Sequence, residues 1–274
     1  MSGRDAVLSV LPTEDPGVHV LRHPDEEITV IVVQRARHGA VFSEAGSTEH
    51  FAVAYQHALG HAGVTLASGV LRTCERDFAQ LQSWFGGLVL PREPMRCLIV
   101  RGQFGAFHAN CSATEIHAAA FSGHNIDLVE MVIMAEVVEV FAAAQGSGWN
   151  CAASNGEALS RVLSTQLYPA QLNGFATAAA WLDSDRPNFV DHNDHTDQNP
   201  VSIGCAVLFL NYLHSQLGAS WLDIVTHGRD TLGETHRALV NTASTGWPEF
   251  SAMLAARFPM GKPSRVKGDN VFPL

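Results

Sequence analysis

The sequence lacks the long uncharged apolar run of a membrane-spanning helix. Such a helix needs about 20 consecutive apolar residues, and the most apolar stretch, Ile126–Gln145, contains Glu130, Glu136 and Glu139. The first residues also lack the charged region and long apolar segment that together mark a secretory signal. We therefore expect no membrane partner and predict a cytoplasmic location.

Basic residues are scarce as well. The 274 residues include 17 Lys and Arg against 27 Asp and Glu, a formal net charge of -10. Proteins that bind nucleic acid usually carry a basic stripe that neutralises phosphates, so this charge argues against a nucleic-acid partner. No phosphate-binding loop is present, and no GxGxxG follows a predicted strand, which removes the common nucleotide-binding motifs.

The cysteines are few, odd in number and without CxxC spacing. They favour a reducing compartment, but one or two disulfides remain compatible with the sequence, which leaves the disulfide state open. Cys151 and Cys205 have no histidine at a spacing that would indicate a nucleophile, and buried cysteine is common. The five cysteines are Cys74, Cys97, Cys111, Cys151 and Cys205.

The remaining composition, 46% hydrophobic and 16% charged, is that of a globular protein with a substantial core. After a loose leader, Met1–Gly17, the first half of the chain contains β-branched or alternating segments that predict strands. They are Val18–Leu21, Ile28–Gln34, Glu49–Tyr55, Met95–Val100 and a short edge strand, Ala113–Ala118.

The second half reads as helices. Asn199-Pro200 fits an N-cap followed by proline at the first helical position, and Ser154 with Glu157 has the spacing of a capping box. The predicted helices, including one in the first half, are Leu66–Phe85, Ile126–Gln145, Ser154–Leu167, Gly174–Leu182, Val201–Leu217, Ser220–His227, Leu232–Thr242 and Trp247–Phe258. The tail, Pro259–Leu274, is predicted to be extended.

This order predicts an α+β fold in one domain. A small twisted N-terminal sheet with a helix occupies about residues 18–124, an all-helical C-terminal lobe about 125–258, and the extended tail 259–274. A homo-oligomer is compatible with the slightly apolar composition, although no feature specifies its symmetry.

The helix predicted at Ile126–Gln145 is the central feature. Apolar residues lie on every side of its helical wheel, which is typical of a helix buried all round. A buried carboxylate must be paired, protonated or bound to a cation. Glu136 and Glu139 are three residues apart and share a face of the helix, so they are candidate functional residues.

The order of elements resembles the catalytic domain of gluzincin-type zinc metallopeptidases. In that family a helix and a twisted sheet with an edge strand precede an active-site helix that carries HExxH. A second glutamate ligand follows on the next helix, and a helical lobe closes the cleft. Ala135-Glu136-Val137-Val138-Glu139 lies where HExxH would lie, and Glu157 matches the downstream glutamate. The resemblance spans roughly Glu49 to Phe258.

The sequence departs from that family at both histidines, where Ala135 and Glu139 stand instead. Zinc hydrolysis needs three protein ligands and an open position for water, so ordinary zinc chemistry is doubtful and the cofactor is unknown. The resemblance implies catalytic positions at Glu136, Glu139 and Glu157. A cluster of three carboxylates also suits a hard divalent cation, with Glu139, Glu157 and His195 as its candidate ligands.

Histidine is abundant, with 14 residues. His57 and His61 have the spacing of a metal-binding pair, but the neighbouring glycines favour a polar loop there. His195 lies in a polar segment, Asp191–Asp197, which offers oxygen and nitrogen ligands but lacks the glycine and terminal glutamate of an EF-hand; a solvated connection is the simpler interpretation. Further histidines flank the predicted edge strand and the glutamate helix, namely His108, His117 and His124.

Three hypotheses follow. The favoured one is a metallopeptidase-like protein without zinc histidines, a pseudoenzyme that serves binding or scaffolding. The alternative is a hydrolase that uses Glu136, Glu139 and Glu157, with or without a non-zinc divalent metal. The third is an unrelated α+β protein whose glutamates pair with basic residues such as Arg161.

Overall fold

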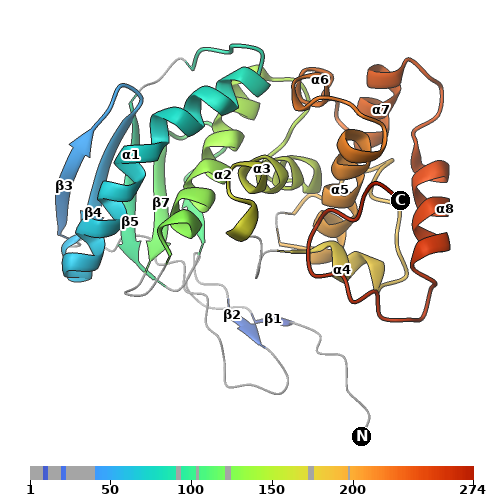
Figure 1. Cartoon of the computed structure of the whole chain (residues 1–274), viewed down its shortest axis with the longest axis horizontal. Coiled ribbons are helices and arrows are strands. Elements are labelled where there is room, and N and C mark those ends of the chain that lie inside the picture. The colour runs from blue at the N-terminus through green and yellow to red at the C-terminus, as the bar shows by residue number, and fades with distance from the viewer. Residues whose placement is uncertain are drawn as a thin grey trace, which may run out of the picture. The chain divides into compact units, whose positions relative to one another are not determined.

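The computed structural model describes residues 41–90, 94–102, 105–120, 125–171, 176–196 and 198–274, together with the backbone of two short strands, β1 (Ser9–Leu11) and β2 (Val20–Arg22). These residues form an α+β structure, as predicted, with a five-stranded sheet followed by a mainly helical second half (Figure 1). No helix in the described part of the chain has the length and apolarity that a membrane span requires.

The chain divides into two compact units. The sheet unit comprises residues 1–75, 94–109 and 114–133, and the helical unit comprises residues 76–93, 110–113 and 134–274. The two longest helices, α1 (Gly60–Trp84) and α2 (Ile126–Gln145), each contribute residues to both units. The division within α2 falls between residues 133 and 134.

The sheet has the order β3-β4-β5-β7-β6. Its central strands, β4 (Phe51–Gln56), β5 (Met95–Arg101) and β7 (Glu115–Ala120), run parallel to one another. The outer strands, β3 (Phe42–Ser47) and β6 (Ala106–His108), pair antiparallel to β4 and β7. Strands buried on both faces read as continuous apolar runs, which is why β5 was recognisable in the sequence.

The prediction of an edge strand at Ala113–Ala118 is wrong in its position within the sheet. β7 lies inside the sheet between β5 and β6, and Ala118, Ala119 and Ala120 are buried. The edge is formed by β6, which has three residues in a glycine-containing segment without a β-branched pattern. Neither β6 nor β3 was predicted, because both are held by pairing with a neighbouring strand rather than by their own composition.

The strands predicted nearest the N-terminus have mixed outcomes. β2 overlaps the predicted strand Val18–Leu21 and pairs antiparallel with β1, which lies inside the segment expected to be a loose leader. The predicted strand Ile28–Gln34 lies outside the described residues.

α1 begins earlier than predicted, at Gly60 rather than Leu66, and His57 lies in a 3-10 turn just before it. The polar loop expected around His57 and His61 is therefore wrong. Glycine here permits close packing instead of ending the helix: a Cβ atom on Gly63 would lie 2.4 Å from the Tyr55 ring, and one on Gly69 would lie 2.3 Å from Ile126. These glycines let α1 approach β4 and the start of α2.

α2 spans Ile126–Gln145, the bounds that the apolar pattern predicted. In the helical unit, α3 (Ser154–Leu167) also has its predicted bounds. The other predicted helices occur as α4 (Ala178–Leu182), α5 (Pro200–Asn211), α6 (Trp221–Thr226), α7 (Leu232–Val240) and α8 (Trp247–Arg257). A π-helical turn, Tyr212–Gln216, continues α5.

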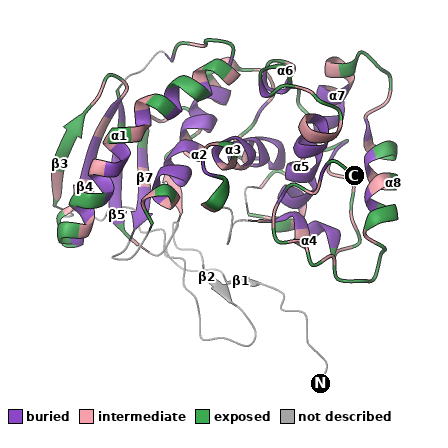
Figure 2. Ribbon diagram, in the orientation of Figure 1, coloured by how far each residue is buried: buried purple, intermediate pink, exposed green. Residues whose placement is uncertain are grey.

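The helical unit is built around α5, which is buried along almost all its length (Figure 2). Asn199 caps α5 as predicted, because its side chain accepts a hydrogen bond from the Val201 amide at 3.0 Å and Pro200 follows at the first helical position. Phe209 of α5 packs against Phe250 of α8, and the two rings meet edge to face with centroids 5.1 Å apart.

Candidate functional site

Glu130, on the first half of α2, is held inside the sheet unit. It is 3% exposed, and the Thr73 hydroxyl of α1 donates a hydrogen bond of 2.8 Å to its Oε1. Gly69 lies one turn before Thr73, and its missing side chain leaves room for Ile126 and Glu130. Glu130 thus links α2 to α1 through a hydrogen bond, which is a structural role.

Glu136 and Glu139 lie on the second half of α2, in the helical unit. Glu136 is half-buried, whereas Glu139 is 8% exposed. A carboxylate oxygen of Glu139 lies within 4.8 Å of the Cys151 sulfur, which belongs to the segment between α2 and α3. Burying a carboxylate almost entirely costs free energy unless neighbouring groups compensate its charge. The groups around Glu139 therefore determine whether it is charged or protonated.

Glu157 forms an ion pair with Arg161, one turn later on α3. The Arg161 Nε lies 2.7 Å from the Glu157 Oε1, and the two side chains are 22% and 16% exposed. A charge-assisted hydrogen bond of this length in a mostly buried place is stronger than a surface ion pair. The cation therefore offsets much of the negative charge that a metal or a substrate would otherwise meet at Glu157.

The capping box predicted for Ser154 and Glu157 is wrong. Ala153 occupies the N-cap position and makes no side-chain cap. Ser154 is instead fully buried: its amide donates to the Asp194 carbonyl at 2.9 Å, and its hydroxyl accepts from the Asp194 amide at 3.1 Å. The Ser154 hydroxyl therefore binds Asp194, a distant residue, instead of capping the start of α3. The Glu157 side chain pairs with Arg161 instead of closing the capping box.

Asp269, in the C-terminal tail, belongs to the same group of charges. It is 4% exposed, and the backbone amides of Thr177 and Ala178 donate to its Oδ1 at 2.7 and 2.8 Å. Burial raises the pKa of Asp269, whereas these two amides and the positive charge of Arg161 oppose that rise. Arg161 thus pairs with the Glu157 carboxylate and also attracts the carboxylate of Asp269.

Sequence reasoning missed Asp269. The tail has no helix, as predicted, and hydrogen bonds attach it to the helical unit. The Asn211 side chain donates to the Asp269 carbonyl at 3.0 Å, and the Leu274 amide donates to the Gln216 side chain at 2.7 Å. No local pattern marks an aspartate in a Pro/Gly-rich tail as a buried residue.

The polar loop before α5 uses its side chains to connect the helices. Asp194 contacts Ser154, and the Asn199 side chain donates to the Asp194 carboxylate at 2.7 Å. The Asn193 side chain donates to the Asp230 carbonyl. His195 is exposed, and Asp197 lies outside the described residues. The loop is therefore chiefly a structural connection.

The predicted metal ligands are not brought together as a group. Among the described residues, no set of three ligand atoms within 4.8 Å of one another combines Glu139 with Glu157 or with His195, and none combines Glu136, Glu139 and Glu157. The catalytic and metal-binding roles of these residues therefore stay predictions. The arrangement around Arg161 favours charge compensation within the protein.

His57 and His117 have polar partners close to the sheet. His57 and His61 are exposed, and the His57 Nδ1 lies 3.3 Å from the Ser43 hydroxyl. On β7, the His117 Nε2 lies 3.0 Å from Glu115, and its ring stacks on Phe107 with centroids 4.8 Å apart. His108 lies on β6, and His124 lies outside the described residues.

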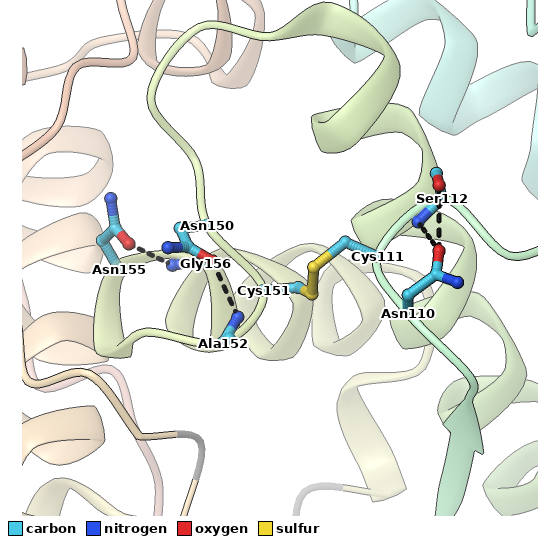
Figure 3. Close-up of a disulfide and its surroundings, with 8 residues drawn as sticks. All are labelled: Asn110, Cys111, Ser112, Asn150, Cys151, Ala152, Asn155 and Gly156. Atoms are coloured by element: carbon cyan, nitrogen blue, oxygen red, sulfur yellow. Dashed lines mark hydrogen bonds between the residues drawn. A yellow bond between two sulfur atoms is a disulfide. The ribbon is translucent and has the colours of Figure 1, made fainter.

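Two of the five cysteines form a disulfide, Cys111–Cys151, that the sequence left open (Figure 3). Both sulfur-bearing residues are half-buried. The bond joins the turn between β6 and β7 to the segment that leads into α3. In this form Cys151 has no free thiol for nucleophilic chemistry. The other three cysteines, Cys74, Cys97 and Cys205, are free and buried.

In comparisons with known proteins, no protein-family model and no curated protein matches the chain.

Proposed function

We propose that this chain is a metallopeptidase-like protein that does not hydrolyse peptides and serves as a binding or scaffolding protein. The observation that carries the proposal is the ion pair between Glu157 and Arg161 at 2.7 Å. In the gluzincin pattern a glutamate at this position is a metal ligand. A carboxylate already neutralised by a mostly buried guanidinium gives up that interaction if it binds a metal, which lowers its affinity for the ion.

The surroundings of α2 support the same proposal. Ala135, where the pattern has its first histidine, offers no ligand atom, and Glu139, where it has the second, is 8% exposed beside a disulfide sulfur. Zinc activates water when three protein ligands leave one position open. With one ligand missing and another neutralised, Glu136 alone has no metal-bound water to deprotonate.

The order of elements supports the resemblance to the gluzincin catalytic domain. A helix, α1, and a sheet with a short antiparallel edge strand, β6, precede α2 with its AEVVE sequence. α3, with Glu157, is the next helix, and the remaining helices follow. The mixed sheet and this order of elements are our basis for matching Glu136 to the family's general base and Glu157 to its glutamate ligand.

The first experiment measures metal content and peptide hydrolysis. The purified full chain is incubated with Zn²⁺, Mn²⁺ or Ca²⁺, desalted and assayed by elemental analysis and with a mixed fluorogenic peptide library. We expect substoichiometric metal and no hydrolysis above the Glu136→Gln variant. One equivalent of metal that is lost in Glu157→Gln, or hydrolysis that is lost in Glu136→Gln, would establish the alternative hydrolase function and refute the proposal.

A second experiment restores the missing ligands. The double substitution Ala135→His and Glu139→His places two imidazoles at i and i+4 on α2, and Arg161→Gln releases Glu157. If the resemblance is correct, the triple variant binds one equivalent of zinc more tightly than the double variant, because a third ligand becomes available.

The native pair His57 and His61 supplies the control for that experiment. Replacing both by alanine in every variant removes the other imidazole pair with metal-binding spacing. Equal zinc affinity in the double and triple variants would mean that Glu157 does not reach the restored site, which contradicts the gluzincin assignment.

We also retain the cytoplasm as the proposed location. The support is the odd number of cysteines without CxxC spacing, which is typical of a reducing compartment. Fractionation of cells that express the tagged chain tests this location, and recovery outside the cytoplasmic fraction contradicts it.

A further inference from the structure

The only two lysines of the chain lie close together near its C-terminus. Lys262 and Lys267 fall within the segment 257–267, which also contains Arg257 and Arg265 and has no acidic residue. The whole chain has a formal net charge of -10, so this basic segment, 257–267, carries charge of the opposite sign to that of the rest of the molecule. A local excess of positive charge attracts acidic groups within about a Debye length, roughly 8 Å at physiological ionic strength.

The cations of the basic segment are exposed and have no partner within the described part of the chain. All four side chains are exposed, and none of them forms an ion pair or a hydrogen bond with another described residue. Arg257 lies in the last turn of α8, where the helix dipole favours a cation. Lys262, Arg265 and Lys267 follow the helix and have no such local role.

The other described arginines of the helical unit are held differently. Each of them contacts an acidic side chain or a backbone carbonyl of the same unit, so its charge serves the structure. The contacts are those of Arg76 with Asp77, Arg161 with Glu157, Arg186 with the Leu182 carbonyl, Arg229 with the Gly228 carbonyl and Arg237 with Glu234. The cations of the basic segment therefore stand apart as charges that the helical unit itself does not use.

The backbone of the basic segment is fixed on the helical unit. It follows α8 and passes α4 (Figure 1), where the Ser264 amide donates to the Asp183 carboxylate at 2.6 Å. Further along, Asp269 is held by two backbone amides of the same unit. Arg265 has a φ of 57°, in the left-handed region that residues with a side chain seldom adopt. A held backbone presents the cations with less entropy for a partner to remove.

One large apolar side chain lies among these cations. Met260 is 55% exposed and stands between Arg257 and Lys262 in the sequence. Methionine is flexible and adapts to apolar groups of different shapes, which suits a binding surface. The basic segment thus offers an apolar contact together with several positive charges.

We propose that the basic segment is a docking surface for an acidic peptide segment of a partner protein. Carboxylates of the peptide pair with Lys262, Arg265 and Lys267, and an apolar side chain of the peptide packs on Met260. The inference rests on the proposed function as a binding protein and names the class of its partner. Its test measures neither metal nor hydrolysis, so either proposal can fail without the other.

A short acidic peptide matches this surface better than an extended polyanion does. Nucleic acid or an anionic membrane reaches well beyond a Debye length from the basic segment and is repelled by the acidic remainder of the chain. Single-stranded nucleic acid also needs exposed aromatic side chains on which bases stack, and Phe258, the aromatic residue of the segment, is half-buried. The carboxylates of a peptide need to reach only the local positive charge.

Fluorescence anisotropy tests the docking surface with two labelled peptides. One is a short peptide of glutamate and leucine, and the other is a matched peptide of glutamine and leucine. The full chain is titrated with each at low salt and again at about 0.5 M NaCl, where the Debye length is only a few Å. We expect only the acidic peptide to bind, and its affinity to fall with salt. No binding of the acidic peptide at low salt overturns the proposal.

The double variant Lys262→Gln and Lys267→Gln tests whether these cations carry the binding. We expect the acidic peptide to bind about tenfold more weakly, because two charge pairs are lost. The control, Arg229→Gln with Arg237→Gln, removes the same charge from the same unit and should change Kd by less than about twofold. Unchanged affinity in the lysine variant, or equal weakening in both variants, means that the basic segment does not hold the peptide. Thermal unfolding of each variant verifies that it is folded.

Met260→Ser tests the apolar part of the surface. We expect the glutamate–leucine peptide to bind about threefold more weakly, and a peptide with serine in place of leucine to be unaffected. Equal effects on both peptides contradict the contact with Met260.

Three other occupants of the basic segment are outcomes of the same experiment. Tighter binding of phosphatidylserine vesicles or of a single-stranded oligonucleotide than of the acidic peptide would overturn the proposal in favour of that ligand. Self-association in sedimentation velocity that disappears in the lysine variant would assign the segment to a second copy of the chain and also overturn it.

Discussion

The sheet unit and the helical unit each hold a glutamate that is largely buried, and the hydrogen-bond donors that these two glutamates meet differ. In the sheet unit, Glu130 receives a hydrogen bond from the neutral hydroxyl of Thr73, on a neighbouring helix that glycine allows to come close. In the helical unit, Glu157 pairs with a cation, Arg161, which also attracts Asp269. A hydroxyl satisfies a carboxylate oxygen without changing the net charge, whereas a guanidinium compensates it. Arg161 is therefore the cation that compensates Glu157, and its charge also attracts Asp269.

The largest effect should come from Arg161→Met, which keeps the length of the side chain and removes its charge. Breaking a buried pair by deleting one partner typically costs about 3–5 kcal/mol, because the other charge stays in a poorly hydrated place. We expect the free energy of unfolding, measured by urea titration, to fall by about this amount. The double variant with Glu157→Gln should recover part of the loss, and a double variant no more stable than Arg161→Met would mean that the pair does not carry the effect.

A smaller effect is expected in the sheet unit from Thr73→Val, which is nearly isosteric and removes the hydroxyl that contacts Glu130. A buried carboxylate that loses one hydrogen-bond donor costs about 1–3 kcal/mol. Urea unfolding of Thr73→Val measures it. Thr65→Val, at an exposed position of the same helix, is the matched control and should change stability by less than about 0.5 kcal/mol. Equal losses in both variants would show that helix propensity, and not Glu130, is responsible.

The smallest effect concerns the pH dependence of stability at Asp269. Its pKa is raised in the folded protein, so the folded state binds the proton more tightly than the unfolded state does. Its contribution to stability is therefore fully present below the ordinary aspartate pKa and is lost as pH rises through the raised folded value. Asp269→Asn keeps the acceptor oxygen for the Thr177 and Ala178 amides and removes the titration.

The measurement for Asp269 is the midpoint of thermal unfolding across the acidic pH range. We expect Asp269→Asn to lose less stability than the native protein as pH rises from about 4 towards neutrality. Parallel curves for the two proteins would mean that the pKa of Asp269 is not raised on folding.

Much of the fold could be read from the sequence where the signals are local. α2 has its predicted bounds because twenty residues of nearly unbroken apolar pattern are a helix signal that needs no partner. The cap at Asn199 and Pro200 was equally readable. Sequence patterns gave wrong or no predictions where a distant segment makes the decisive contact. The Ser154 hydroxyl binds Asp194 instead of capping α3. The strand β6 is formed by pairing with β7 and has no strand pattern of its own.

The candidate site shows the same division. Local sequence patterns were enough to predict that α2 is a buried helix with acidic residues, and that Glu157 and Arg161 lie one helical turn apart on α3. Folding alone reveals which of the five cysteines form the disulfide. It also reveals that Arg161 attracts Asp269, which lies more than a hundred residues away in the sequence. Periodicity and caps are set by neighbours along the chain, but burial and charge compensation depend on groups that only folding brings together.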